Sequence, residues 1–233
     1  MDQIFYDWWR SLGARDFHNA TPVTGDDRLY TDEELLKSLQ YLLGIPDASF
    51  RDGQLEACRH VANGKTQNAI VGLDCGVGKS MTFTLPLFAK CRHGKIDGIT
   101  IVICAHRADL DQHFVTASDQ LKDTDIRIGS FTSGCIDEDF TLEKMEEHDL
   151  IFLSLNAWSR IVTDKHDGII SELRKKNGVS HVIFDEYHML YEENSIRKAE
   201  YLSSRHLLAI SAPKCSGEIC TLERVTVHLC MHT

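Results

Sequence analysis

The sequence predicts an α/β fold with a mostly parallel sheet and helices on both of its faces. Short apolar stretches, typical of buried strands, alternate with longer amphipathic or polar stretches, typical of helices, along most of the 233 residues. One of the strand-like stretches, Asn68–Gly72, also leads directly into a glycine-rich turn that a helix follows. Such alternation forms right-handed β-α-β units, in which the strands end at one edge of the sheet and ligands bind there.

The composition narrows the possible functions. Lys and Arg total 25 against 35 Asp and Glu, a net charge of −10, so a basic surface covering the whole chain is excluded and any nucleic-acid contact must be local. Eight cysteines follow no regular framework, and several lie inside apolar runs, which favours a reducing, intracellular compartment without structural disulfides. There is no secretory leader and no apolar run long enough to cross a bilayer, so no membrane partner is expected.

Three segments are expected along the chain. Residues 1–30 are irregular, with aromatic residues near the start, and we assign them no chemistry. Residues 31–213 carry the alternating pattern and form the single predicted domain. No pattern assigns a structure to the tail, residues 214–233. Its metal-ligand residue types have no spacing typical of zinc sites, so chance clustering is favoured for Cys215, Cys220, His228, Cys230 and His232.

Two helices are expected before the glycine-rich turn. Thr31 and Glu34 form a capping box ahead of leucines spaced for one helical face, and Gly44 ends this helix. The second helix follows the segment Phe50–Gln54 and runs to about His60, and Asn63–Gly64 closes it. Both helices precede the strand that opens into the turn.

The later elements follow from the same periodicities. Ile99–Cys104 is a continuous apolar run of the kind that buried parallel strands show. The other predicted elements, in chain order, are helices at Met81–Ala89 and about Arg107–Leu121, a strand at Ile126–Phe131, a helix at Thr141–His148, a strand at Leu150–Leu155, helical stretches up to Lys176, and strands at Val182–Phe184 and Leu207–Ile210.

The glycine-rich turn is expected to bind a polyphosphate. Gly76 and Gly78, on either side of Val77, let the backbone fold so tightly that successive N–H groups point at the phosphates, and the helix that follows adds its positive end. Lys79 would reach the β and γ phosphates of ATP, and the Ser80 hydroxyl would coordinate Mg²⁺.

This phosphate loop departs from the strict G-x-x-x-x-G-K-[ST] pattern at its first position. Leu73 stands there, and Gly72 comes one residue too early. The alternative is a strand-to-helix turn that binds nothing. The phosphate-binding interpretation is favoured because Gly78-Lys79-Ser80 follows a buried-looking strand and precedes an amphipathic helix.

An acidic pair supplies what a phosphate loop lacks. Hydrolysis of ATP needs a carboxylate that holds the metal and a base that orients the attacking water. Asp185, at the end of the apolar run Val182–Phe184, would bind Mg²⁺, and Glu186 would polarise the water. An acidic pair in a surface turn is the alternative. The position directly behind a predicted strand favours the catalytic roles for Asp185, Glu186 and Lys79.

The order of these motifs resembles the first motor domain of superfamily 2 helicases. The segment Asp185–His188, D-E-Y-H, looks like the DExH box of that group. The segment Phe50–Gln54 is similar to the F-R-x-G-Q element that RecQ-type DNA helicases carry ahead of the phosphate loop. The resemblance covers roughly residues 50–213 and implies a P-loop NTPase with a RecA-like, three-layer domain. It also implies that Gln54 reads the adenine edge of ATP, with Arg51 nearby.

Other segments have counterparts in the same family. Cys104–Arg107 stands where the family has its first strand-end nucleic-acid motif, and Ser154–Asn156 stands where RecQ proteins have S-P-E. Ser211–Pro213 resembles the S-A-T element that couples the nucleotide state to movement. The implied partner is single-stranded or partly duplex DNA, and the implied contact and coupling residues are His106, Arg107, Ser154, Asn156, His188 and Ser211.

Helicases of this type also need a second motor domain, which closes on the nucleotide and supplies an arginine finger. The chain ends about twenty residues after Pro213, too few for such a domain. We therefore expect a domain that binds ATP and Mg²⁺, contacts DNA weakly, and does not unwind DNA unless a second motor domain acts in trans.

Two other functions share parts of the pattern. A truncated nucleotide-binding or interaction module, in which ATP only stabilises the fold, carries the same motifs. A P-loop kinase or metabolic NTPase shares the phosphate loop, but it would need an acceptor pocket and a lid segment that the sequence does not indicate. The basic residues Arg174–Lys176 could touch phosphate or act as a weak nuclear signal, but a solvated helix face is favoured for them. A nuclear location is expected for the protein.

Overall fold

The computed structural model describes residues 30–63, 69–73, 77–94, 96, 98–135, 141–163, 178–185 and 225–229. The aromatic residues near the start of the chain and the predicted strand at Leu207–Ile210 lie outside the described residues. Among the helices that the structure describes, none combines the length and the apolar character that crossing a bilayer requires.

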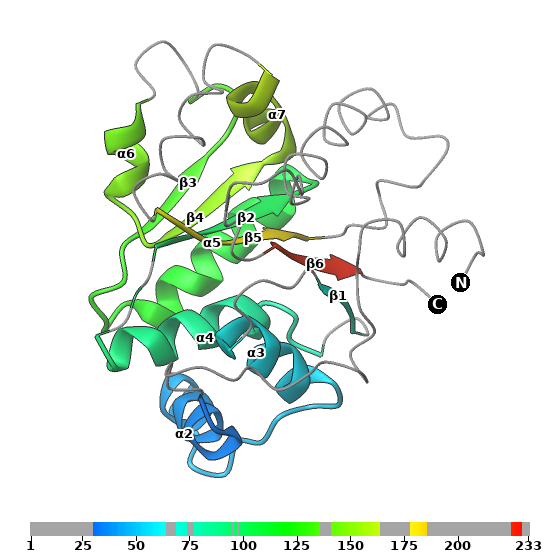
Figure 1. Ribbon diagram of the computed structural model, residues 1–233, viewed down its shortest axis with the longest axis vertical. Coiled ribbons are helices and arrows are strands. Elements are labelled where there is room, and N and C mark those ends of the chain that lie inside the picture. The colour runs from blue at the N-terminus through cyan, green and yellow to red at the C-terminus, as the bar shows by residue number, and fades with distance from the viewer. Residues whose placement is uncertain are drawn as a thin grey trace, which may run out of the picture.

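A parallel sheet forms the centre of the domain (Figure 1). In the described residues it has six strands in the order β1-β6-β5-β2-β4-β3, and every neighbouring pair is parallel. The strands are β1 Ala69–Gly72, β2 Ile99–Cys104, β3 Ile128–Phe131, β4 Leu150–Ser154, β5 Val179–Phe184 and β6 Val225–Leu229. The predicted α/β class with a mostly parallel sheet is confirmed.

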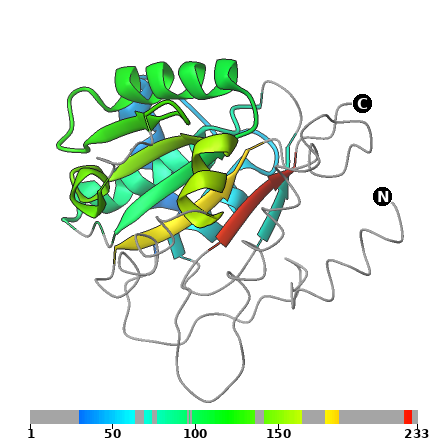
Figure 2. The ribbon, with the colours of Figure 1, turned by 90° about the horizontal axis from the view of Figure 1, so that it is seen from above.

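The described residues contain six helices, two ahead of the first strand and four between successive strands. They are α2 Asp32–Leu43, α3 Gln54–Asn63, α4 Met81–Arg92, α5 Arg107–Leu121, α6 Leu142–Glu146 and α7 Leu155–Thr163. Helix α4 packs against α2 and α3, and these three lie together in Figure 1. Helix α5 runs along one face of the sheet, against β2, β3 and β4 (Figure 2). Helix α7 contacts β2 and β4.

Alternate side chains of each central strand belong to different layers of the core. Val102, Phe152 and Ile183 join the large cluster formed with α4 and α5. Phe184, the next residue along β5, instead meets Trp158 of α7 with ring centroids 6.5 Å apart. Because successive strand residues point to opposite faces, α7 covers the face of the sheet opposite to α4 and α5. The result is the three-layer arrangement that the sequence predicts.

The first helix shows how local sequence sets an element. The Thr31 hydroxyl accepts a hydrogen bond from the Glu34 N–H, and the Glu34 carboxylate accepts one from the Thr31 N–H, so the predicted capping box is present. Gly44 adopts the left-handed conformation, φ 65°, and ends α2. Leu35 and Leu39 are buried and carry α2 onto the core.

Strand β6 lies within residues 214–233, where the sequence predicts no element. It pairs with β1 on one side and with β5 on the other. This part of the tail therefore belongs to the sheet, and it separates β1, which leads into the phosphate loop, from β5, which Asp185 follows. Two strand spacings of about 4.8 Å place the axes of β1 and β5 roughly 10 Å apart.

Some predicted boundaries shift. Strand β4 ends at Ser154 rather than Leu155, because Leu155 begins α7 and the Ser154 hydroxyl accepts the N–H of Ala157. Strand β5 begins at Val179, three residues before the predicted start. Strand β3 and helix α6 are shorter than predicted, and α3 and α4 each extend further, to Asn63 and Arg92.

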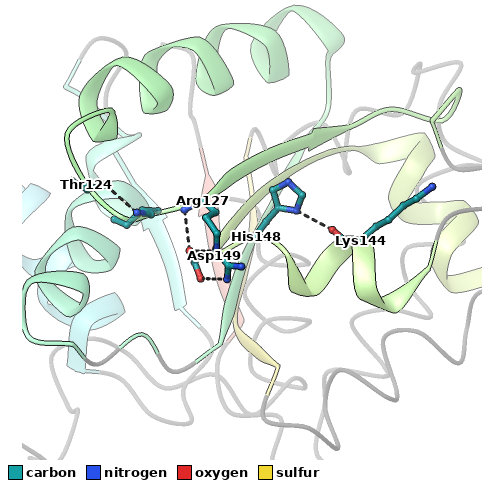
Figure 3. A network of polar contacts seen from close by, with 6 residues as sticks. Thr124, Arg127, Lys144, His148 and Asp149 are labelled. Atoms are coloured by element: carbon teal, nitrogen blue, oxygen red, sulfur yellow. Dashed lines mark hydrogen bonds and ion pairs between the residues drawn. The ribbon is translucent and has the colours of Figure 1, made fainter.

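A polar network joins the amino ends of three strands, at the edge opposite the predicted site (Figure 3). The Arg127 guanidinium donates to both oxygens of Asp149, at 3.0 and 3.1 Å, and the Arg127 N–H donates to the same carboxylate at 2.9 Å. The Asp149 carbonyl accepts the N–H of Thr100 at 2.9 Å. The hydrogen bond that Arg127 donates to Asp149 raises the pKa of Arg127. Asp149 thus links the starts of β2, β3 and β4.

Replacing Asp149 by alanine is expected to lower the free energy of unfolding by about 1–2 kcal/mol, a modest value because the Arg127 side chain is 57% exposed. Urea denaturation checks this. The control is Asp111→Ala, since Asp111 pairs with Arg107 on an exposed helix face and its loss should change stability by less than about 0.5 kcal/mol. Equal effects of both substitutions would contradict the structural role of Asp149.

Candidate nucleotide site

The described part of the phosphate loop, residues 77–80, leads from β1 into α4. Gly78 has φ 85°, a conformation that favours glycine. The carbonyl of Gly78 accepts the N–H of Met81 at 3.0 Å, and the carbonyl of Lys79 accepts the N–H of Thr82 at 2.9 Å. Since a peptide N–H points opposite to the carbonyl of the same peptide group, the N–H groups of Lys79 and Ser80, just ahead of α4, point away from that helix. They form the positive helix end that a phosphate would meet.

Ser80 stands at the N-cap of α4 without capping it. Serine is one of the residues that usually cap a helix, yet the Ser80 side chain makes no capping hydrogen bond. The Ser80 hydroxyl thus makes no capping hydrogen bond to the backbone of α4. Ser80 and the preceding Lys79 are both partly exposed at the mouth of the loop.

Gln54 fastens the segment Phe50–Gln54 to the phosphate loop. Its amide nitrogen donates to the carbonyls of Val77 at 3.2 Å and of Gly78 at 3.1 Å, and its amide oxygen accepts the N–H of Arg51 at 3.1 Å. The side chain is 4% exposed. The adenine contact of Gln54 that the resemblance implies stays a prediction, and in the structure the amide contacts the loop backbone. Arg51 is exposed beside it.

Gly53 makes this docking possible. It has φ 72°, and a Cβ at this position would lie 2.9 Å from the Cδ2 atom of Leu73, the residue that follows β1. A side chain would therefore combine backbone strain with a clash. Glycine lets the chain turn into α3 against the phosphate loop.

Asp185 follows β5 at the same edge of the sheet. It is 8% exposed, and its N–H donates to the carbonyl of Ile103 at 2.9 Å, which continues the β5 pairing with β2. Its Oδ2 atom lies 2.7 Å from the Nε2 atom of His113 on α5. A buried carboxylate needs a compensating charge or hydrogen bonds, so this position suits a bound cation.

Sequence reasoning missed His113. The residue is a single histidine in a helix, with no motif around it. A weak signal exists, because His113 shares the helical face of Leu110, Ala117 and Leu121, which are all buried against the sheet. That face could have indicated contact with the strand ends, but not the contact with Asp185.

The predicted nucleic-acid residues that are described lie at the starts of two helices. His106 precedes α5, and Arg107 begins it, exposed and 3.4 Å from the Asp111 carboxylate. Ser154 precedes α7 and caps it, and Asn156 is exposed in its first turn. Both helices follow strands β2 and β4, so all four residues share the edge of the sheet with Lys79 and Asp185. The predicted site residues Gly76, Glu186, His188 and Ser211 lie outside the described residues.

The family model for DEAD/DEAH box helicases matches residues 51–214, more than half of the chain. The chain belongs to the DEAD/DEAH box helicase family. No curated protein sequence matches it. The expectation of a helicase motor domain is confirmed at the level of the family. Members of this family bind ATP with a metal ion.

Two solved helicase structures share the fold. One is the DUF1998 helicase MrfA bound to DNA, with a TM-score of 0.61 and 12% identity over 91% of this chain and 28% of that one. The other is a hypothetical ATP-dependent RNA helicase from Sulfolobus tokodaii, with a TM-score of 0.55 and 12% identity over 85% of this chain and 50% of that one. This helicase chain thus spans half or less of these relatives.

The residues of the helicase site fit a magnesium ion. Mg²⁺ prefers oxygen ligands and is usually held by one or two protein oxygens together with phosphate oxygens and water. The Ser80 hydroxyl and the Asp185 carboxylate are ligands of this kind. The described residues hold no cluster of three or more His, Cys, Asp or Glu that would bind a metal without a nucleotide.

Two buried thiols near the site are chemically inert. Burial raises the pKa of Cys58 to about 12, and its thiol lies 3.5 Å from the Met81 carbonyl. Burial also raises the pKa of Cys104, at the end of β2, and the nearby carboxylates of Asp185 and Asp109 act in the same direction. Because only a thiolate is a strong nucleophile, neither residue suits covalent catalysis.

Proposed function

We propose that this chain is the ATP-binding first motor domain of a RecQ-like, ATP-dependent DNA helicase. The observation that carries the proposal is the contact of Gln54 with the carbonyls of Val77 and Gly78. It joins the F-R-D-G-Q segment, which resembles the RecQ element, to the loop that would hold the phosphates. The same segment therefore belongs to the nucleotide site.

The proposed roles follow from chemistry at this edge of the sheet. Lys79 neutralises the β and γ phosphates, and the N–H groups just ahead of α4 bind their oxygens. Ser80 and Asp185 hold Mg²⁺, which would polarise the phosphoryl oxygens. Glu186 orients the attacking water.

DNA is the proposed partner. Arg107 and Asn156 are exposed at the starts of α5 and α7, where helix ends add positive potential for a phosphate backbone. With a net charge of −10, such contacts must be local, and binding by this domain alone should be weak. His106, Ser154, His188 and Ser211 are further proposed contact or coupling residues. A second motor domain acting in trans would supply an arginine finger for the transition state.

The test is ATP binding and turnover by the purified chain, with and without single-stranded DNA, beside Lys79→Ala. We expect Lys79→Ala to weaken ATP binding at least about tenfold, since a charged hydrogen bond to phosphate contributes about 1.5–3 kcal/mol. The control, Lys37→Ala, removes an exposed lysine that pairs with Glu33 on α2 and should change nothing. Lys79-dependent binding without DNA-stimulated turnover would favour the non-enzymatic nucleotide-binding module. Equal binding by wild type and Lys79→Ala would refute the nucleotide site.

A further inference from the structure

His113 reaches the proposed metal ligand from a different layer of the domain. It lies on α5, 72 residues before Asp185 in the chain, and its Nε2 atom is 2.7 Å from Oδ2 of that carboxylate. Both side chains are largely buried, with 19% of His113 and 7% of Asp185 exposed. A contact this short and this buried restricts how the carboxylate can rotate.

Two aromatic rings hold the His113 ring in place. It stacks on Phe152 of β4 with an interplanar angle of 14° and centroids 6.3 Å apart, and it meets Phe83 nearly edge-on, at 84° and 5.8 Å. Phe83 lies on α4, three residues after Ser80. The imidazole therefore sits between the helix that begins at the phosphate loop and the end of the strand that carries Asp185.

One hydrogen bond from His113 leaves the carboxylate able to bind a cation. An ionised carboxylate offers about four lone-pair sites, and Nε2 uses one of them. In metal sites, groups that hydrogen-bond to a ligating carboxylate fix its orientation, and their removal typically weakens metal affinity by about 10–100-fold. His113 contacts the Asp185 carboxylate in this manner, and the rings of Phe152 and Phe83 fix the position of the histidine itself.

We propose that His113 is a positioning residue for Asp185, which holds the carboxylate in the orientation that binds the Mg²⁺ of the ATP complex. This inference rests on the proposed function of the site. It assigns to His113 no contact with ATP or with the metal. It distinguishes His113 from a residue that only fills the core between α4, α5 and the sheet.

Two substitutions separate these roles. His113→Phe keeps a ring against Phe152 and Phe83 but removes the nitrogen that contacts Asp185. His113→Gln loses the ring but keeps an N–H donor on a side chain of similar reach. Val115→Ala, at a 59% exposed position of the same helix, is the control.

The measurement is the Mg²⁺ concentration that half-saturates binding of a fluorescent ATP analogue, together with binding of the same analogue in EDTA and the thermal unfolding midpoint. We expect His113→Phe to raise the half-saturating Mg²⁺ concentration roughly tenfold or more, to leave metal-free binding unchanged, and to unfold within a few degrees of wild type. His113→Gln should recover part of the Mg²⁺ affinity. Val115→Ala should behave as wild type.

The outcomes are distinct from those for the proposed function. Two results for His113→Phe overturn the positioning role but leave the nucleotide site intact. One is a wild-type half-saturating Mg²⁺ concentration, and the other is an equal loss of affinity for the ATP analogue with Mg²⁺ and in EDTA. If His113→Phe does not fold, His113→Gln decides. A wild-type half-saturating Mg²⁺ concentration in His113→Gln, which lacks the ring, supports positioning by the N–H donor. A rise in that concentration that the loss of thermal stability fully accounts for overturns the positioning role. If Lys79→Ala binds ATP as well as wild type does, the proposed function and this inference both fall.

Discussion

Replacing Asp185 by asparagine is expected to reduce Mg²⁺-dependent ATP turnover at least about 100-fold, with little loss of stability. A metal ion contributes several kcal/mol of charge stabilisation to phosphoryl transfer, and each 1.4 kcal/mol is a factor of ten in rate. Asparagine has nearly the same shape and keeps an oxygen that can accept a hydrogen bond from His113, 2.7 Å away in the native protein. It lacks the negative charge that attracts Mg²⁺.

Turnover is to be measured across a range of Mg²⁺ concentrations, with folding followed by circular dichroism. Asp119→Asn is the matched control, because it makes the same chemical change at an exposed position of α5. Nucleotide binding in EDTA should survive in Asp185→Asn, since the phosphate loop is untouched. A turnover loss of less than about tenfold would mean that Asp185 is not the metal ligand.

The central layers of the fold were predictable because their signals are local. Ile99–Cys104 is apolar apart from Thr100, and it is a strand over the whole of that range. The helix Arg107–Leu121 also has the predicted bounds. Strand β5 was predicted too short because Ser180 and His181 are polar. In the structure both are buried, with the Ser180 hydroxyl 2.8 Å from the His181 ring and 3.4 Å from the buried Lys90 amine of α4. Lys90, from the helix layer, compensates for the burial of these polar strand residues. No local sequence pattern reveals this contact.

Some features of the site were likewise predictable from local sequence, and others depend on how distant segments pack. The phosphate loop and Asp185 are recognisable because each follows directly from a strand in the sequence. The contact of Asp185 with His113 joins residues 72 positions apart, and the contact of Gln54 with Gly78 joins residues 24 positions apart. Both depend on how α3 and α5 pack, so the sequence indicated the segments but not these contacts. The place of β6 between β1 and β5 was likewise set by sheet pairing rather than by a local signal.

Replacing Phe152 by alanine is expected to lower the free energy of unfolding by about 3–5 kcal/mol, the usual cost of removing a buried aromatic side chain. Phe152 is fully buried in the middle of β4, and its ring meets Phe83 at 6.0 Å and the His113 ring at 6.3 Å. The cavity would open between α4, α5 and the sheet, where neighbouring backbone is held by strand pairing and can collapse only partly.

Urea denaturation of Phe152→Ala and Phe152→Leu tests this account, with Phe131→Ala as the control at a partly exposed position of β3. Leucine fills most of the space, so Phe152→Leu should lose less than about 2 kcal/mol. A loss below about 1 kcal/mol in the free energy of unfolding of Phe152→Ala would show that this layer does not support the domain.

Because the rings of Phe152 and His113 are in contact, the effects of replacing them should not be additive. In a chain that already carries Phe152→Ala, His113→Phe should change the Mg²⁺ affinity less than it does alone, since one of the rings that hold the imidazole is already gone.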